Sequence, residues 1–67
     1  MFVIFGRVKG MGEFAEFNTL SKRLVKEGKG SLYIHKERAE KICAVFSELN
    51  KDIYFEVREI ADLDKDY

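Results

Sequence analysis

The stretch FVIFGRVKGMGEFAEF, residues 2–17, decides the fold, because it can be read as a hairpin or as a strand that leads into a helix. Its first part, residues 2–9, predicts a strand in which Phe2 and Ile4 lie on one face and Val3 and Phe5 on the other. A strand that is apolar on both faces is either central in its sheet or covered by a partner on its second face.

The second half of this stretch allows two interpretations. Gly10 and Gly12 can adopt the positive φ angles that hairpin loops require, so residues 13–19 are expected to form a second strand. The alternative is a helix, ended by Gly28, in which one face carries Phe14, Phe17, Leu20, Ser21 and Leu24. The hairpin is favoured, because the helix would hold a glycine in its first turn and β-favouring phenylalanines inside.

The clearest element is a helix over residues 36–50. An apolar stripe recurs with the helical period, at Ala39, Ile42, Cys43, Phe46 and Leu49. Charged residues occupy most of the other positions, so one face of this helix must pack against something. Asn50 and Lys51 suit its C-terminal end.

A sheet is the expected support for this helix. Residues 52–60 alternate as a half-buried antiparallel strand, with Ile53, Phe55 and Val57 on one face. Residues 31–34 predict a brief strand, and the basic connector before them predicts a loop or one to two helical turns. The expected fold is α+β, a small antiparallel sheet with one amphipathic helix on one face (ββαβ), or βαβαβ if the helical alternative holds. Phe2, Ile4, the three apolar residues of the last strand and the helix stripe would form its core.

The length predicts one domain over residues 1–60, followed by an acidic tail over 61–67. Cys43 is the single cysteine, which excludes an intrachain disulfide and fits a reducing compartment. The apolar opening is too short for a signal peptide, and no stretch is long enough to span a membrane. A cytoplasmic location is therefore expected.

Charge is distributed unevenly although the net charge is +0. Residues 1–36 hold seven Lys or Arg against three Glu, which gives +4, and residues 37–67 hold five against nine acidic residues, which gives −4. This asymmetry indicates either a surface for a polyanion or two halves whose charges offset each other when they pack.

The residue types that carry catalysis or bind cofactors do not form a recognisable pattern. His35 is the single histidine and precedes the predicted helix, where it is expected to be an N-terminal capping or boundary residue. Cys43 falls on the apolar stripe, where a buried cysteine behaves as a small hydrophobe. The glycines at 6, 10 and 12 and at 28 and 30 do not match a dinucleotide or phosphate-loop spacing. We expect no enzyme activity, no cofactor and no metal site.

Two surfaces remain as candidates for binding. The first is the sheet face opposite the helix, which would carry Val3, Phe5, Arg7, Tyr54, Glu56 and Arg58. Aromatic and arginine side chains together are typical of protein-binding hot spots, and the same set resembles a platform on which single-stranded nucleic acid stacks. Alternatively, the connector covers this face through Leu20, Leu24 and Val25.

The second surface is the basic connector, near Arg7 and Lys9, which carries Lys22, Arg23, Lys26 and Lys29. Clustered cations would bind an acidic protein or phosphates. A dedicated nucleic-acid-binding domain is usually basic overall, however, and this chain is neutral, so a protein partner is favoured.

The order of elements resembles that of short, largely uncharacterised ββαβ proteins encoded by tailed phages. The resemblance rests on the charged, aromatic hairpin FVIFGRVKGMGEFAEF and on LYIHKERAEKI, in which an apolar stretch leads into a charged helix. It implies a small protein, encoded by a phage or plasmid, that binds and modulates or inhibits a host protein. Expected partners are accordingly a host or phage protein or a second copy of the chain, with single-stranded nucleic acid as the alternative.

Overall fold

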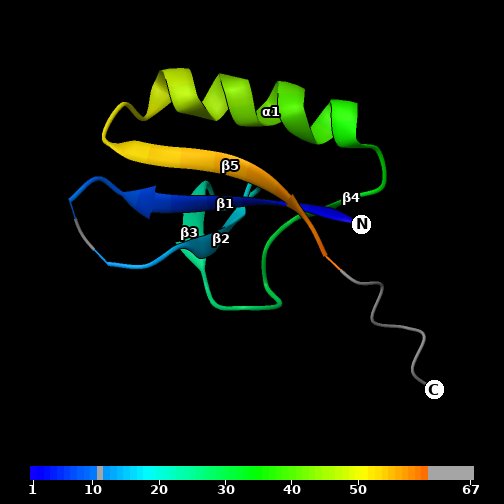
Figure 1. The fold of residues 1–67 in the computed structure, drawn as a ribbon, viewed down its shortest axis with the longest axis horizontal. Coiled ribbons are helices and arrows are strands. Elements are labelled where there is room, and N and C mark those ends of the chain that lie inside the picture. Colours follow the sequence, from blue (N-terminus) through cyan, green and yellow to red (C-terminus); the bar gives the residue numbers. More distant parts are fainter. Residues whose placement is uncertain (11, 61–67) are drawn as a thin grey trace.

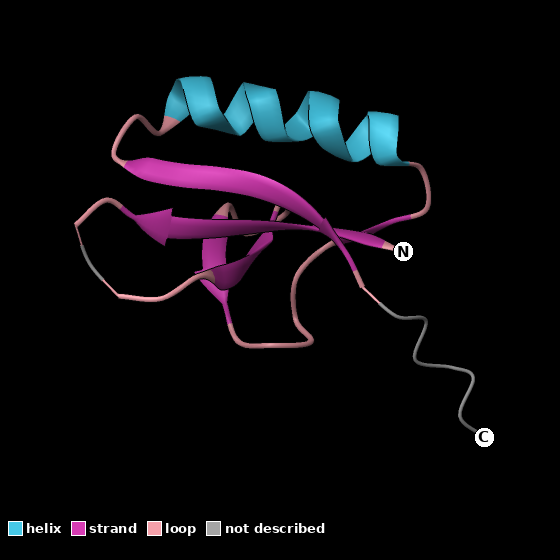
Figure 2. Ribbon diagram, in the orientation of Figure 1, coloured by secondary structure: helices cyan, strands magenta, loops and turns pink. Residues whose placement is uncertain are grey.

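The computed structural model describes residues 1–10 and 12–60. Their elements, in chain order, are β1 (Phe2–Val8), β2 (Ala15–Asn18), β3 (Arg23–Val25), β4 (Leu32–Tyr33), α1 (Lys36–Leu49) and β5 (Ile53–Glu59). One helix lies along a curled sheet, as Figures 1 and 2 show. The predicted α+β class is confirmed, with two short strands added to the ββαβ order. The predicted acidic tail, residues 61–67, lies outside the described residues.

The opening stretch is a hairpin. β1 pairs antiparallel with β2, with Phe5 opposite Glu16 and Gly6 opposite Ala15. The connecting loop contains Gly10 at φ 81° and Gly12 at φ 46°, the left-handed conformation expected of them. The helical alternative is wrong, because residues 15–18 and 23–25 are paired strands.

The connector after β2, predicted as a loop or helical turns, contains a short strand, β3, between two turns. The Asn18 side chain accepts hydrogen bonds from the backbone N–H groups of Leu20 and Ser21, both at 2.9 Å. The Lys22 N–H then donates to the Asn18 carbonyl at 2.7 Å, and Lys22 takes a positive φ of 61°. This Asn-centred turn reverses the chain, so that β3 pairs back on β2.

β1 is the central strand of the five-stranded sheet. β5 pairs with its whole length on one edge, from Phe2 opposite Glu59 to Val8 opposite Ile53. Its other edge is shared, because β4 pairs with Phe2 and Val3 while β2 pairs with Phe5 and Gly6. β3 lies outside β2 and β5 lies outside β1. Of the two explanations for a first strand that is apolar on both faces, a central position or a partner on its second face, the sheet shows the central position.

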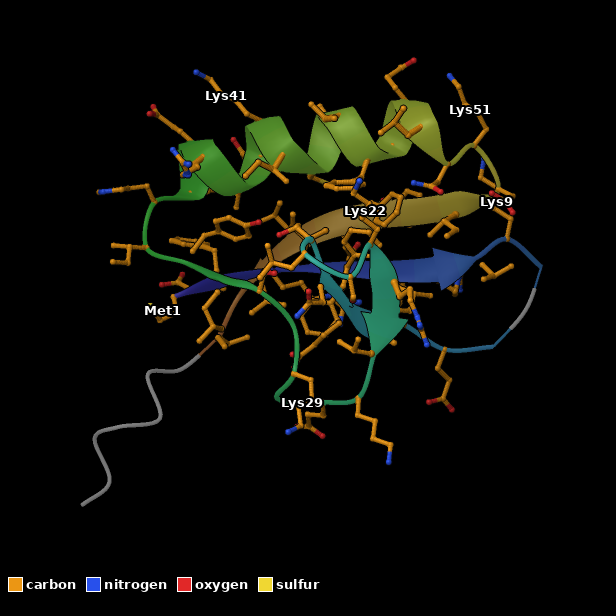
Figure 3. The ribbon with its side chains drawn as sticks, turned by 180° about the vertical axis from the view of Figure 1, so that it is seen from behind. Met1, Lys9, Lys22, Lys29, Lys41 and Lys51 are labelled. Carbon is orange, nitrogen blue, oxygen red and sulfur yellow. The ribbon has the colours of Figure 1, made fainter. Side chains whose placement is uncertain are left out.

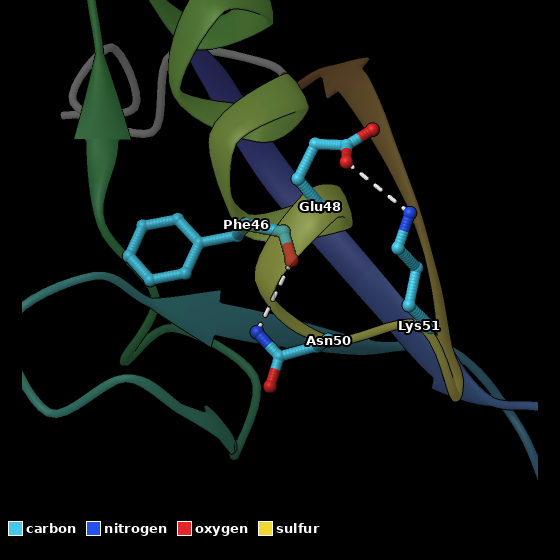
Figure 4. A network of polar contacts seen from close by, with 4 residues as sticks. All are labelled: Phe46, Glu48, Asn50 and Lys51. Atoms are coloured by element: carbon cyan, nitrogen blue, oxygen red, sulfur yellow. Dashed lines mark hydrogen bonds and ion pairs between the residues drawn. The ribbon is translucent and has the colours of Figure 1, made fainter.

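α1 matches the predicted helix to within one residue. His35 precedes it with an extended backbone and makes no capping bond with its side chain. At the other end, the Asn50 side chain donates to the Phe46 carbonyl at 3.1 Å, and Lys51 pairs with Glu48 at 3.2 Å (Figure 4). Leu49, predicted to be in the buried stripe, is 70% exposed, because the last turn of the helix extends past the packed residues and the stripe ends at Phe46.

The core lies between α1 and the sheet. Ile4, Phe17, Phe46 and Phe55 form its buried centre, and partly buried apolar residues of β3, β4, β5 and α1 pack around it. Phe17 meets Phe46 and Phe55 edge to face, at centroid distances of 4.8 and 5.1 Å. Gly6 lies against the Phe55 ring, and an added Cβ would come within 3.1 Å of that ring and 2.9 Å of the Leu24 side chain. The hairpin therefore supplies a core residue, Phe17, that was not in the predicted core.

Candidate functional site

The sheet face opposite α1, here called the outer face, holds the residues expected there. The pairing of β1 with β5 places Val3 opposite Arg58, Phe5 opposite Glu56 and Arg7 opposite Tyr54. These pairs alternate with Ile4–Val57 and Gly6–Phe55, which face the core and the helix. All six predicted residues therefore share the outer face.

Five of the side chains on this face form an aromatic–arginine cluster: Phe5, Arg7, Phe14, Tyr54 and Arg58. The Phe14 ring is its centre, with the Arg7 guanidinium 5.1 Å and the Arg58 guanidinium 4.4 Å from its centroid. Arg58 also lies 4.7 Å from the Phe5 centroid, and Tyr54 meets Phe14 edge to face at 6.0 Å. These cation–π and aromatic contacts preorganise the cluster.

Phe14 is a member of this cluster that the sequence reasoning missed. The observed register places Phe5 opposite Glu16 and Gly6 opposite Ala15, and its continuation brings Phe14 opposite Arg7. The register of the hairpin therefore identifies Phe14 as a neighbour of Arg7, because residues that face each other across an antiparallel pair share one face.

Val3 is not part of the exposed candidate surface. Its side chain is fully buried, between Leu32 on one neighbouring strand and Arg58 on the other. A residue without exposed surface cannot contact a partner directly. Val3 therefore supports the outer face from within, while Tyr54, 49% exposed, is the most accessible aromatic ring of the cluster.

The two arginines of the cluster differ in their electrostatic surroundings. Arg58 forms an ion pair with Glu56, its neighbour on the same face of β5. Arg7 is exposed, and among the described residues no carboxylate lies within ion-pair distance of it. Among the described residues, the cluster thus presents one cation paired with a carboxylate and one without such a partner, both beside aromatic rings.

The basic connector does not form the predicted compact patch. Because β3 is extended, Lys22 and Lys26 flank its three residues at opposite ends, with about 10 Å of strand between them. Figure 3 shows Lys9, Lys22 and Lys29 in three well-separated places. Lys9, Lys22, Arg23 and Lys26, all exposed, are therefore individual surface charges rather than one site.

The loop between β3 and β4 covers the β2 end of the outer face. Glu16, buried on that face, accepts hydrogen bonds from the backbone N–H groups of Gly28 at 3.0 Å and Gly30 at 2.8 Å. The Ser31 hydroxyl accepts a further bond from the Thr19 N–H at 2.9 Å. The connector therefore covers part of this face, as the packing alternative expected, but through Glu16 and its loop rather than through Leu20, which is 90% exposed.

Cys43 is half-buried on α1, and burial raises the pKa of its thiol above the ordinary value. Since only the thiolate is nucleophilic, the raised pKa leaves less of the reactive form at neutral pH. We expect iodoacetamide to alkylate Cys43 more slowly in the folded protein than in urea-unfolded protein at the same pH. Mass spectrometry over time measures this ratio, and equal rates would contradict it.

The described residues hold no group of three or more His, Cys, Asp or Glu side chains that could bind a metal ion. α1, the helix in the described part of the chain, is too short and too polar to cross a membrane. Comparison with protein families, with curated proteins and with solved structures finds no match in any of the three. Evidence for the function of the aromatic–arginine cluster therefore comes from its geometry.

Proposed function

We propose that this chain is a small non-enzymatic protein-interaction module that binds a partner protein through the aromatic–arginine cluster. The observation that carries the proposal is the Phe14 ring held between two arginines and Tyr54 on a sheet face that the helix leaves uncovered. Rigid aromatic and arginine anchors are the side chains that dominate binding energy in protein interfaces. A role as modulator or inhibitor of a host protein, the role implied by the phage-like pattern, is the form of this function that we favour.

The cluster suits a partner that offers a carboxylate beside an apolar group. Arg7 supplies a cation with no acidic partner among the described residues, and Tyr54 supplies an exposed ring with a polar tip. Binding single-stranded nucleic acid is the second candidate, because the same face combines rings with arginines. It is the weaker one, because Arg58 already lies over both Phe5 and Phe14, where bases would stack, and Glu56 places a negative charge beside them.

The test begins with affinity capture of partners from the cells that encode the protein, followed by calorimetry with the purified partner. We expect Tyr54→Ser and Arg7→Ala each to weaken binding by about 30-fold, the scale of a hot-spot residue. Leu49→Ser and Lys41→Ala are the matched controls, because they change an exposed apolar and an exposed cationic residue of α1. Unchanged affinity in both cluster variants would refute this surface.

Fluorescence anisotropy with labelled oligonucleotides separates the two candidates. A protein-interaction module shows no measurable binding at about 50 mM salt, whereas a nucleic-acid-binding protein binds and loses affinity steeply as salt rises. Binding that disappears in Arg7→Ala would favour the nucleic-acid function over the proposed one.

A further inference from the structure

One backbone edge of β5 is unpaired within residues 1–10 and 12–60. β5 pairs with β1 along its whole length, and no other described strand pairs with it. In Figure 1, β1 runs along one side of β5, and no described strand lies on its other side, toward α1. A seven-residue edge strand is long for an unprotected one, and such an edge is a template for another strand.

The hydrogen bonds at the two ends of the ladder show which groups lie on this free edge. The Lys9 N–H donates to the Asp52 carbonyl at 3.0 Å, and the Ile60 N–H donates to the Met1 carbonyl at 2.9 Å. Because bonded pairs alternate in an antiparallel ladder, Tyr54, Glu56 and Arg58 direct their backbone groups toward β1. Phe55 and Val57 direct theirs outward, and no described residue accepts or donates a bond there.

We propose that the occupant of this edge is β5 of a second copy of the chain, paired antiparallel about a twofold axis at Phe55. Phe55 then exchanges two backbone hydrogen bonds with its own copy. The Val57 N–H donates to the Ile53 carbonyl of the other copy, and this is repeated by symmetry. The Ile53 N–H is already used within the chain, because it donates to Asn50 at 3.1 Å.

Charge complementarity selects this occupant and this register. With Phe55 at the axis, Lys51 faces Glu59, Asp52 faces Arg58, Ile53 faces Val57 and Tyr54 faces Glu56 of the other copy. Every charged residue thus meets an opposite charge or a hydroxyl donor. An axis at Glu56 would set Glu56 against itself, and an axis at Val57 would set the buried Phe55 against Glu59.

The pairing is independent of the proposed function, although it would place the two aromatic–arginine clusters side by side on one continuous sheet. The interface is isologous, as in most homodimers, and closes after two copies. It is also small, so the dimer is expected to form only at high concentration.

Sedimentation equilibrium from about 1 µM to about 1 mM protein tests the dimer. We expect the wild-type chain to associate, and Lys51→Glu and Glu59→Lys each to weaken the association about tenfold by setting like charges opposite each other. The double variant K51E/E59K restores attraction and should return to wild-type affinity. Glu37→Lys is the control, because Glu37 is an exposed residue on α1, and this variant should associate as strongly as the wild type.

Amide hydrogen exchange, measured by NMR at low and high protein concentration, shows directly which β5 amides become protected in the dimer. The Phe55 and Val57 amides should become protected as concentration rises, whereas Tyr54 and Glu56, already bonded to β1, should not change. A monomer over the whole range, or a dimer that leaves the Phe55 and Val57 amides unprotected, would overturn the proposal. A dimer that the double variant fails to restore would overturn the register.

Discussion

Phe17→Ala is expected to lower the free energy of unfolding by about 3–5 kcal/mol, the largest effect of any single side chain here. Phe17 is 1% exposed and contacts Phe46 and Phe55 edge to face, so truncation removes both contacts and leaves a cavity at the centre of the core. A domain of this size has about 3–10 kcal/mol of stability in total, so the variant should be largely unfolded.

Urea denaturation followed by far-UV circular dichroism measures this loss. Phe17→Leu, which keeps most of the apolar volume, should fall between the alanine variant and the wild type. Leu20→Ala is the matched control in the neighbouring turn, and its stability should lie within about 0.5 kcal/mol of the wild type, because Leu20 is 90% exposed. Equal stabilities of Phe17→Ala and Leu20→Ala would contradict the described core.

Glu16→Ala is expected to cost about 1–3 kcal/mol, because it removes the buried carboxylate that accepts the part-buried hydrogen bonds of the Gly28 and Gly30 N–H groups. Glu16→Gln should cost nearly as much, since an amide offers one oxygen and turns its NH₂ group toward the second N–H. The loop between β3 and β4 should lose hydrogen-exchange protection in both variants. The same urea titration quantifies the change.

Glu27→Ala is the control for Glu16, because Glu27 is an exposed carboxylate in the same loop. It should leave both stability and exchange unchanged. If Glu16→Ala behaved like Glu27→Ala, the carboxylate would not be the anchor of the loop.

Most of the fold was predictable from the sequence, and the reasons are local. The helix at 36–49 follows from its apolar stripe and the last strand from its alternation, while the hairpin follows from two glycines that tolerate positive φ. The six residues of the outer face follow from alternation alone, once both long strands are identified. Each of these features depends on a period or a conformational preference that neighbouring residues display.

The features that could not be predicted depend on contacts between distant residues. Strand β3 forms because the Asn18 turn returns the chain to β2, although the sequence of the connector suits a turn or a helix equally well. This extended strand separates Lys22 from Lys26 and so removes the basic patch that their nearness in sequence suggested.

The sequence by itself determined the class of this protein, its main helix and long strands, and which side chains share the outer face, because periodicity assigns a face to each residue. Tertiary structure alone decided that Phe17 completes the core, that Phe14 joins the cluster, that Val3 is buried and that Glu16 holds a loop. These outcomes depend on hairpin register and loop packing, which are set by the summed contacts of segments far apart in the chain.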